Sequence, residues 1–230
     1  MKNKKSGIKL KTDKLIMGQF SNTITAYVTL LKSLMHDHYQ IKNDPKIKYE
    51  ARTVSIINPS KLTGFEYQKK LIVTEDYDTW GDHNNSKAME ECAYYQETIF
   101  DSRKFEKAMK LLKKNHYSKK AIIDLNKNPT PSNGKVPCLT YLSFRVINGK
   151  LNMSAHMRAN NAYLVTRINM DVNQAIHHEA SRILSIPLGD YYHFVDSMHI
   201  YNQDIFAARN LLTKMTFSRR KNRSFKNAKR

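Results

Sequence analysis

The sequence predicts a single α+β domain with basic ends. With 230 residues and 40% hydrophobic side chains, the chain can bury one substantial core. Segments with a helical apolar period alternate with short runs rich in β-branched and aromatic residues. No segment approaches the roughly 18 to 20 apolar residues that a membrane span needs, so we expect no membrane contact. We place the folded domain at 15–213, between basic tails at 1–14 and 214–230.

The net charge of +19 is concentrated in those tails. The two ends carry +13 and the remaining residues only +6, so we expect disordered, solvated tails that can also contact nucleic acid through its phosphates. Cys92 and Cys138 lie in unlike contexts and predict no disulfide framework. The N-terminal residues lack the apolar stretch of a secretory signal. We therefore expect a cytoplasmic protein.

The first 125 residues predict three helices and three strands. Apolar residues at helical spacing predict helices, whereas short β-branched runs that stop at turn residues predict strands. Polar residues at 36–50 and 76–85 predict loops. The expected helices are 23–35, 87–95 and 104–114, and the expected strands are 51–59, 66–73 and 121–125.

The second half predicts a hairpin, a helix and a final strand. An Asn148-Gly149 turn joins two runs of β-branched and aromatic residues, so Cys138 begins one strand and Arg158 ends its partner. Residues 171–184 predict a central helix. His199 and Tyr201, one residue apart on an apparent strand, should face the same side.

Cys138 is the candidate nucleophile. A guanidinium beside a thiol favours the thiolate, which is the reactive form, and the predicted hairpin brings Arg158 next to Cys138. Taken alone, Cys138 fits a small buried core residue better than a catalytic thiol. The subsequent Asn169, His199 and Tyr201 favour a catalytic site instead, with an amide and a His/Tyr pair following the thiol at tight spacing.

A resemblance to the thymidylate synthase superfamily covers the stretch from Pro137-Cys138 to His199-Ile200-Tyr201, in the order, the spacing and the type of its residues. This superfamily includes the deoxypyrimidine nucleotide hydroxymethylases. The resemblance implies a large mixed sheet packed against helices, with one sheet face used for dimerisation. It also implies one-carbon transfer to C5 of a pyrimidine deoxynucleotide through a bond between Cys138 and C6, with 5,10-methylenetetrahydrofolate as the donor.

The resemblance further implies a shared phosphate site. Arg52 stands at the position of an early phosphate-binding arginine, and Arg158 at that of a later one. Lys119 and Lys120 stand where the partner subunit donates two arginines, so the charge is kept while the bidentate fork of arginine is lost. If these positions correspond, each active site is shared and the protein is an obligate homodimer.

The remaining binding residues also follow from the resemblance. Asn169 matches the asparagine that pairs with the pyrimidine edge, and an amide satisfies both N3–H and O4 of uracil, which favours dUMP over dCMP. His199 and Tyr201 would hold the sugar hydroxyl. Asn161 takes the place of a family aspartate in the substrate site, without its proton-linked role. Val165 replaces a glycine beside the folate.

One family element is not evident in the sequence. The family carries an apolar helix with a catalytic glutamate between the early arginine and a tyrosine that corresponds to Tyr94, and here Glu66 or Glu91 would have to substitute for that glutamate.

Three hypotheses remain open. The chain is a folate-dependent enzyme acting on dUMP, which produces either a methyl or a hydroxymethyl group. Alternatively, it keeps the fold and the thiolate but uses another pyrimidine nucleotide or one-carbon source. In the third hypothesis, it binds nucleotide or nucleic acid without turnover and the basic tails are its functional part.

Overall fold

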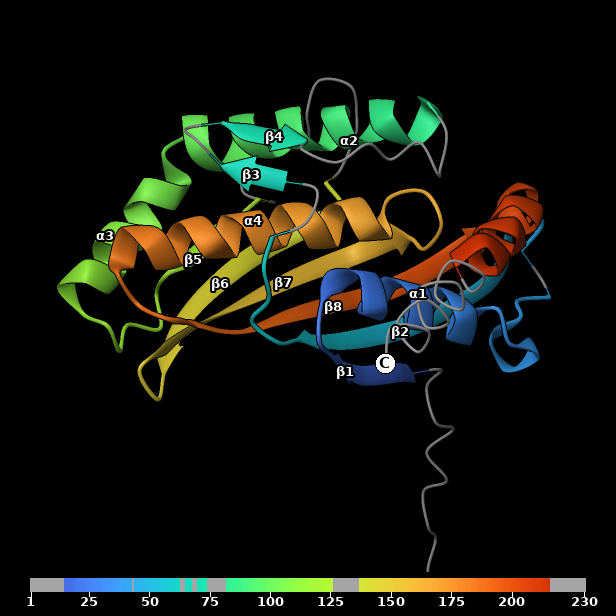
Figure 1. The fold of residues 1–230 in the computed structure, drawn as a ribbon, viewed down its shortest axis with the longest axis horizontal. Coiled ribbons are helices and arrows are strands. Elements are labelled where there is room, and N and C mark those ends of the chain that lie inside the picture. The colour runs from blue at the N-terminus through green and yellow to red at the C-terminus, as the bar shows by residue number, and fades with distance from the viewer. Residues whose placement is uncertain are drawn as a thin grey trace, which may run out of the picture.

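The computed structural model describes residues 15–42, 44–62, 65–67, 70–73, 82–125 and 137–215. Its centre is a six-stranded mixed sheet in the order β1-β2-β8-β7-β6-β5 (Figure 1). These strands are β1 (Leu15–Phe20), β2 (Ile47–Ile57), β5 (Ile122–Asp124), β6 (Leu139–Ile147), β7 (Lys150–Asn161) and β8 (Leu188–Tyr201). A separate two-stranded sheet pairs β3 (Phe65–Tyr67) with β4 (Leu71–Val73).

The helices described lie on one face of the large sheet (Figure 1). Two of them, α1 and α4, connect parallel strand pairs, β1 with β2 and β7 with β8, as crossover helices do. The four α-helices that carry labels are α1 (Thr23–Leu34), α2 (Asp82–Tyr95), α3 (Lys104–Lys114) and α4 (Thr166–Leu184), and a π-helix, η3 (Gln96–Asp101), joins α2 to α3. Residues 205–215 form a further helix, after the short η4 (Asn202–Asp204), and η1 (Asp37–Tyr39) precedes β2.

The core lies between the sheet and the helices. Helix α4 contributes most to it, because fifteen of its nineteen residues are buried. Seven of these fifteen are apolar or small enough to pack in the usual way, and the rest include Asn169, Asn173 and His177. Nδ2 of Asn169 lies 3.5 Å from Oδ1 of Asn160, and Nε2 of His177 lies 2.7 Å from the carbonyl of Leu151, so polar contacts to β7 hold α4 to the sheet as well as apolar packing.

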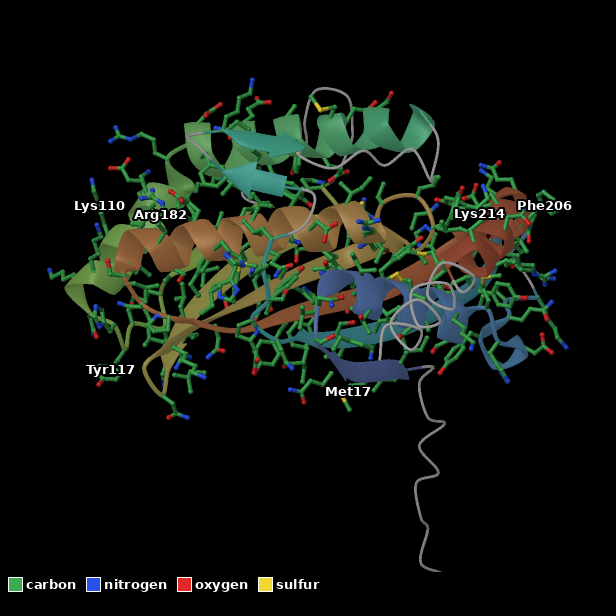
Figure 2. The ribbon with its side chains drawn as sticks, in the orientation of Figure 1. Met17, Lys110, Tyr117, Arg182, Phe206 and Lys214 are labelled. Atoms are coloured by element: carbon green, nitrogen blue, oxygen red, sulfur yellow. The ribbon has the colours of Figure 1, made fainter. Side chains whose placement is uncertain are left out.

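The opposite face of the sheet carries no helix of the described part of the chain (Figure 1). We call it the open face and define it by the side chains that alternate with the buried ones on each strand. Met17 points away from the helices on this side (Figure 2) and is 68% exposed. The open face comprises Leu15 and Met17 on β1; Glu50, Arg52, Val54 and Ile56 on β2; Tyr192, Phe194 and Asp196 on β8; Ser154, His156 and Arg158 on β7; Tyr141, Ser143, Arg145 and Ile147 on β6; and Ile122 on β5.

The predicted α+β class and the mixed sheet packed against helices are confirmed, as are the helices at 23–34 and 104–114. The predicted hairpin is also present, because β6 and β7 are antiparallel neighbours. Asn148 and Gly149 both have positive φ, 51° and 71°, which is the geometry of a type I′ turn.

Several boundaries differ from the prediction. Polar residues at 36–50 were expected to form a loop, but they include η1 and the start of β2, where every second side chain is buried. The expected strand at 66–73 is two strands, β3 and β4. Residues 82–85, expected in a loop, begin α2, and the rest of that loop lies outside the described residues.

The central helix begins at Thr166 rather than at 171, so Asn169 lies in its first turns. Strand β1 and the helix at 205–215 had no counterpart in the prediction. The basic tail at 1–14 lies outside the described residues, as does the C-terminal tail from 216 onward, whereas 214 and 215 belong to the last helix.

Candidate active site

Cys138 and Arg158 lie side by side at one end of the β6–β7 hairpin. The backbone N–H of Arg158 donates to the carbonyl of Cys138 at 2.9 Å. The Arg158 guanidinium also donates, through Nε, to the carbonyl of Pro137 at 3.0 Å. The cation is therefore anchored to the segment that carries the thiol, and both side chains keep access to solvent.

Three neighbouring influences set the pKa of Cys138. Partial burial under the surrounding atoms raises it, although the thiol still reaches solvent. The positive charge of Arg158 lowers it, and the negative charge of Glu91 raises it. Arg158 therefore acts in the direction expected from the sequence, but burial outweighs it and the pKa of the free thiol stays above its ordinary value.

Helix α2 brings Glu91, Tyr94 and Tyr95 to the thiol. Tyr94 and Tyr95 are both close enough to Cys138 for its charge to contribute to their pKa values, and Glu91 contributes to the pKa of all three. Burial is the main cause that raises the pKa of Tyr94 to about 12 and that of Tyr95 well above its usual value. Both phenols therefore stay protonated as hydrogen-bond donors near neutral pH.

Tyr95 connects the thiol region to Asn169. The Tyr95 hydroxyl donates a short hydrogen bond to Oδ1 of Asn169, and both residues are 1% exposed. Nδ2 of Asn169 donates to the carbonyl of Val165 at 3.0 Å. These contacts hold the Asn169 amide at the start of α4, beside Tyr95, whose pKa is influenced by the charge of Cys138.

Asn161, His199 and Tyr201 lie at the carboxyl ends of the parallel strands β7 and β8. Asn161 is the register partner of His199, and the rings of His199 and Tyr201 are in contact, with centroids 5.0 Å apart. Oδ1 of Asn161 accepts from the backbone N–H groups of Tyr163 and Leu164, each at 2.9 Å, and its Nδ2 donates to Asp204. Asn161 thus shapes the turn into α4.

Arg52 and Arg158 lie on the open face at the same level. Residues 51 and 53 of β2 pair with Met198 and Val195 of β8, which in turn pair with residues 160 and 157 of β7. One strand separates the two arginines, so their backbones are about 10 Å apart. Asp196 of β8, which is also on the open face, lies between the two arginines in this register.

Lys119 and Lys120 do not reach this site within one chain. They precede β5, whose Ile122 pairs with Ser143, and this register places Lys120 opposite Arg145 near the turn of the hairpin. Arg145 pairs with Asn152, six residues before Arg158 on β7. The two lysines therefore lie about 20 Å along the sheet from the Cys138 end.

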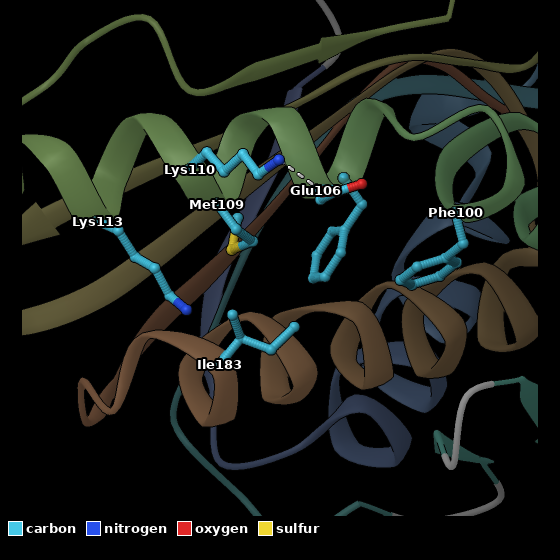
Figure 3. A pocket seen from close by; sticks show the side chains of 7 residues that line it. Phe100, Glu106, Met109, Lys110, Lys113 and Ile183 are labelled. Atoms are coloured by element: carbon cyan, nitrogen blue, oxygen red, sulfur yellow. Dashed lines mark ion pairs between the residues drawn. The ribbon is translucent and has the colours of Figure 1, made fainter.

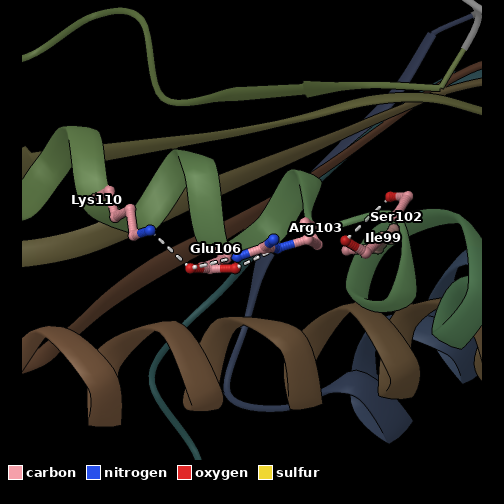
Figure 4. Close-up of polar contacts among 5 residues, drawn as sticks. All are labelled: Ile99, Ser102, Arg103, Glu106 and Lys110. Carbon is pink, nitrogen blue, oxygen red and sulfur yellow. Dashed lines mark hydrogen bonds and ion pairs between the residues drawn. The ribbon is translucent and has the colours of Figure 1, made fainter.

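A cavity of about 400 Å³ lies elsewhere, between α3 and α4 (Figure 3). Phe100, Phe105, Met109 and Ile183 form its apolar walls, with Glu106, Lys110 and Lys113 at the rim. Glu106 is held by Arg103 at 2.9 Å and Lys110 at 2.8 Å (Figure 4). Ile183 is fourteen residues beyond Asn169 on the same helix, about 21 Å away, so this cavity is separate from the Cys138 site.

Within the described ranges, no group of three or more His, Cys, Asp or Glu side chains is arranged to hold a metal ion. None of the helices described is long and apolar enough to cross a bilayer.

The sequence did not single out Tyr95, and it gave only weak support to Glu91. Helix α2, which carries both, is polar. It therefore differs from the apolar, glutamate-bearing helix that the resemblance implies and that was not evident in the sequence. The pair Tyr94-Tyr95 at the end of an acidic segment was the available signal. Glu66, the other residue considered, lies on β3.

The chain is similar in sequence to known proteins. The profile of the family described as thymidylate synthase matches residues 42–227. A deoxyuridylate hydroxymethyltransferase of Bacillus phage SP01 is 35% identical over 72 residues, which cover 31% of this chain and 19% of the phage protein. The thymidylate synthase of Listeria monocytogenes serotype 4a is 23% identical over 107 residues, which cover 46% of this chain and 34% of that enzyme. The matches thus span about a fifth to a third of these relatives.

Proposed function

Because the chain belongs to the thymidylate synthase family, we propose that it transfers a one-carbon unit to C5 of a pyrimidine deoxynucleotide, with dUMP preferred. It would do so as a thymidylate synthase or a deoxyuridylate hydroxymethylase. The observation that carries the proposal is the convergence of Cys138, Arg158, Tyr95 and Asn169, from the β6–β7 hairpin and the helices α2 and α4, on one end of the sheet.

Cys138 supplies the nucleophile. Its thiolate adds to C6 of the pyrimidine, and the electrons of the C5–C6 double bond move toward O4, so that C5 becomes nucleophilic. After C5 has gained the new carbon, a base takes the C5 proton and the nitrogen of the donor leaves that carbon. Hydride or water then adds to the exocyclic carbon, the C5–C6 double bond re-forms and the thiolate leaves. Glu91 is the carboxylate that we assign to this proton transfer, because it is close enough to raise the pKa of the Cys138 thiol.

A small equilibrium fraction of ionised Cys138 should be sufficient for the reaction. Burial holds the pKa of the free thiol above its usual value, while Arg158 already opposes that shift. A nucleotide base that stacks against the thiol gives the thiolate an electrophile, so a small equilibrium fraction of thiolate is sufficient for addition.

For the one-carbon donor we propose 5,10-methylenetetrahydrofolate, which would supply the carbon and, for a methyl product, also the hydride that reduces it, whereas addition of water would give hydroxymethyl. Val165 is the residue that would meet it. Its side chain is half-buried at the first turn of α4, and its carbonyl accepts from both the backbone N–H and Nδ2 of Asn169. The donor would therefore lie against an isopropyl group and close to the residue that reads the base.

The phosphate site that we propose is shared between two subunits. Arg52 and Arg158 would hold the phosphate from one chain. Lys119 and Lys120, about 20 Å away in the same chain, would come from a second copy packed on the open face. The proposal therefore includes a homodimer, in which the sheet face that carries Met17, Ile122 and Ile147 is covered.

The remaining contacts follow the same geometry. Asn169 would pair with N3–H and O4 of uracil, and its Nδ2 would give up the hydrogen bond to the Val165 carbonyl in order to reach O4. The adjacent His199 and Tyr201 would hold the sugar hydroxyl. Asn161 would border the base while shaping the turn that leads into α4.

Release of tritium from [5-³H]dUMP tests this proposal. We expect release that requires methylenetetrahydrofolate, that is much slower from [5-³H]dCMP, and that is lost in Cys138→Ser. Cys92→Ser is the matched control, because Cys92 is buried within α2 and its pKa is raised to about 12, so its loss should leave release intact. The mass of the product then separates methyl from hydroxymethyl.

Failure of this test has a defined meaning. If a folded dimer releases no tritium from either nucleotide with or without the folate, the enzyme proposal is wrong. Salt-sensitive binding of DNA or RNA that is lost on removing 214–230 would then support a binding protein, whose net charge of +19 is its functional feature.

A further inference from the structure

A buried chain of polar side chains continues from Asn169 into the core. Asn160 and His193 are 1% and 0% exposed, and both lie on central strands beneath α4. Nδ2 of Asn169 lies 3.5 Å from Oδ1 of Asn160, and Nδ2 of Asn160 lies 3.4 Å from Nε2 of His193. On its other side, Nδ1 of His193 lies 2.7 Å from the hydroxyl of Tyr191.

His193 is neutral, since complete burial lowers its pKa to about 3. A neutral imidazole has one donor and one acceptor nitrogen, and its neighbours select the tautomer. Nδ2 of Asn160 also donates to the sulfur of Met157 at 3.2 Å, which fixes the NH₂ side of that amide toward His193. Nε2 of His193 must then accept, and Nδ1 must carry the proton and donate to Tyr191.

This tautomer of His193 fixes the orientation of the side-chain amides of Asn160 and Asn169. With its NH₂ group turned to His193, Asn160 presents its carbonyl oxygen to Nδ2 of Asn169. Tyr95 donates to Oδ1 of Asn169 from the other side. Each donor therefore faces an acceptor along the series Tyr95, Asn169, Asn160, His193 and Tyr191, and rotating one amide by 180° would set two donors or two acceptors against each other.

We propose that His193 is a positioning residue that acts through Asn160 to hold the Asn169 amide in the sense complementary to uracil, and so sets the choice between 4-oxo and 4-amino pyrimidines. The inference rests on the proposed function. Uracil offers an acceptor at O4 and a donor at N3, whereas cytosine offers a donor at N4 and an acceptor at N3. An Asn169 amide rotated by 180° matches cytosine, so an asparagine that is free to rotate discriminates poorly.

The test compares two variants of one residue. His193→Gln keeps a neutral acceptor and donor in the same order, because its carbonyl oxygen can replace Nε2 and its NH₂ group Nδ1. His193→Leu removes both. For each protein, kcat/KM and Kd are measured with dUMP and with dCMP in the full-length chain, and circular dichroism reports folding. Tyr191→Phe, which removes the hydroxyl acceptor of Nδ1, provides a third variant if His193→Leu does not fold.

We expect the ratio of kcat/KM for dUMP over dCMP to fall at least tenfold in His193→Leu, to fall in Tyr191→Phe, and to stay within about threefold of the wild-type ratio in His193→Gln. A purely structural role would weaken both nucleotides alike and leave the ratio unchanged. Nitrogen-15 NMR of the imidazole in the nucleotide-free protein should show the proton on Nδ1.

Two results would overturn the positioning role alone: a proton on Nε2, or an unchanged ratio in a folded His193→Leu that still turns over dUMP. A wild-type protein that binds neither nucleotide would overturn the proposed function itself, and the positioning role with it. The NMR result and the wild-type binding experiment therefore distinguish the two failures.

Discussion

At the scale of single residues, two opposite charges act on the same thiol. Arg158 lowers the pKa of Cys138 and Glu91 raises it. We expect Arg158→Gln to raise the pKa of the thiol further and Glu91→Gln to lower it, because each substitution removes one charge and keeps a side chain of similar size. The pH dependence of alkylation by iodoacetamide, followed at Cys138 by peptide mass spectrometry, measures both shifts.

The direction of the two shifts is the control. A general loosening of the site would move both variants the same way, toward the ordinary pKa of a cysteine. Shifts in the same direction would therefore contradict the electrostatic account of this thiol. Cys92 serves as an internal reference, since burial raises its pKa to about 12 and should keep it unreactive in all three proteins.

At the scale of elements, a buried histidine joins α4 to the sheet. His177 is 2% exposed, its Nε2 lies 2.7 Å from the carbonyl of Leu151 on β7, and burial lowers its pKa to about 4. The unfolded chain binds a proton at this residue below about pH 6.5, while the folded protein does not until about pH 4. Stability from His177 is thus fully present above pH 6.5 and is lost progressively toward pH 4.

We therefore expect the free energy of unfolding to fall as the pH is lowered from 7 to 4. His177 should contribute on the order of 1 kcal/mol for each pH unit. His177→Gln keeps a donor for the Leu151 carbonyl and removes the titration, so its urea-derived stability should fall less steeply over this range. His116→Gln, at an exposed histidine after α3, is the matched control and should follow the wild type. Identical slopes for His177→Gln and the wild type would refute this account.

The helices and strands also show which parts of the fold could be predicted from the sequence. Local signals gave α3 and the hairpin at Asn148-Gly149, because an amphipathic period and a two-residue turn are properties of neighbouring residues. The first turn of α4 was missed because its Thr166 and Asn169 are poor helix formers whose burial depends on the sheet beneath. Strand β1 was missed because it is short and lies at the sheet edge.

In the candidate site, too, contacts between neighbouring residues were predictable from the sequence and long-range contacts were not. The neighbourhood of Cys138 and Arg158 was predictable from the hairpin, whereas the approach of Tyr95 to Asn169 spans 74 residues and depends on how α2 packs against α4. The sequence likewise gave no sign of the contact between Asn160 and His193, which requires the parallel pairing of β7 and β8.

At the scale of the whole molecule, the open face should be a subunit interface. Phe194 lies at its centre, where its ring stacks on Tyr192 and meets His156. A lysine there would bury an unpaired charge, so Phe194→Lys should weaken dimerisation at least about a hundredfold. Phe206→Lys makes the same change at a 77% exposed residue on the last helix and should leave the dimer intact (Figure 2). Sedimentation velocity measures both, and a monomeric wild type would contradict the interface.

If each active site is shared between two subunits, two variants that are inactive alone should restore activity to each other in a heterodimer. Cys138→Ser lacks the nucleophile, and a Lys119→Ala, Lys120→Ala double variant lacks the cations that we assign to the neighbouring chain's phosphate site, so each homodimer should be inactive or strongly impaired. In a heterodimer, one site takes Cys138 from the lysine variant and both lysines from the cysteine variant, whereas the other site lacks all three. Random assortment makes half of the dimers mixed, each with one working site, so co-expression should restore roughly a quarter of the wild-type rate. Tritium release by the co-expressed mixture measures this recovery, and the separately expressed variants combined without subunit exchange are the control. If the sites were complete within one chain, the mixture would show only the average of its two parents.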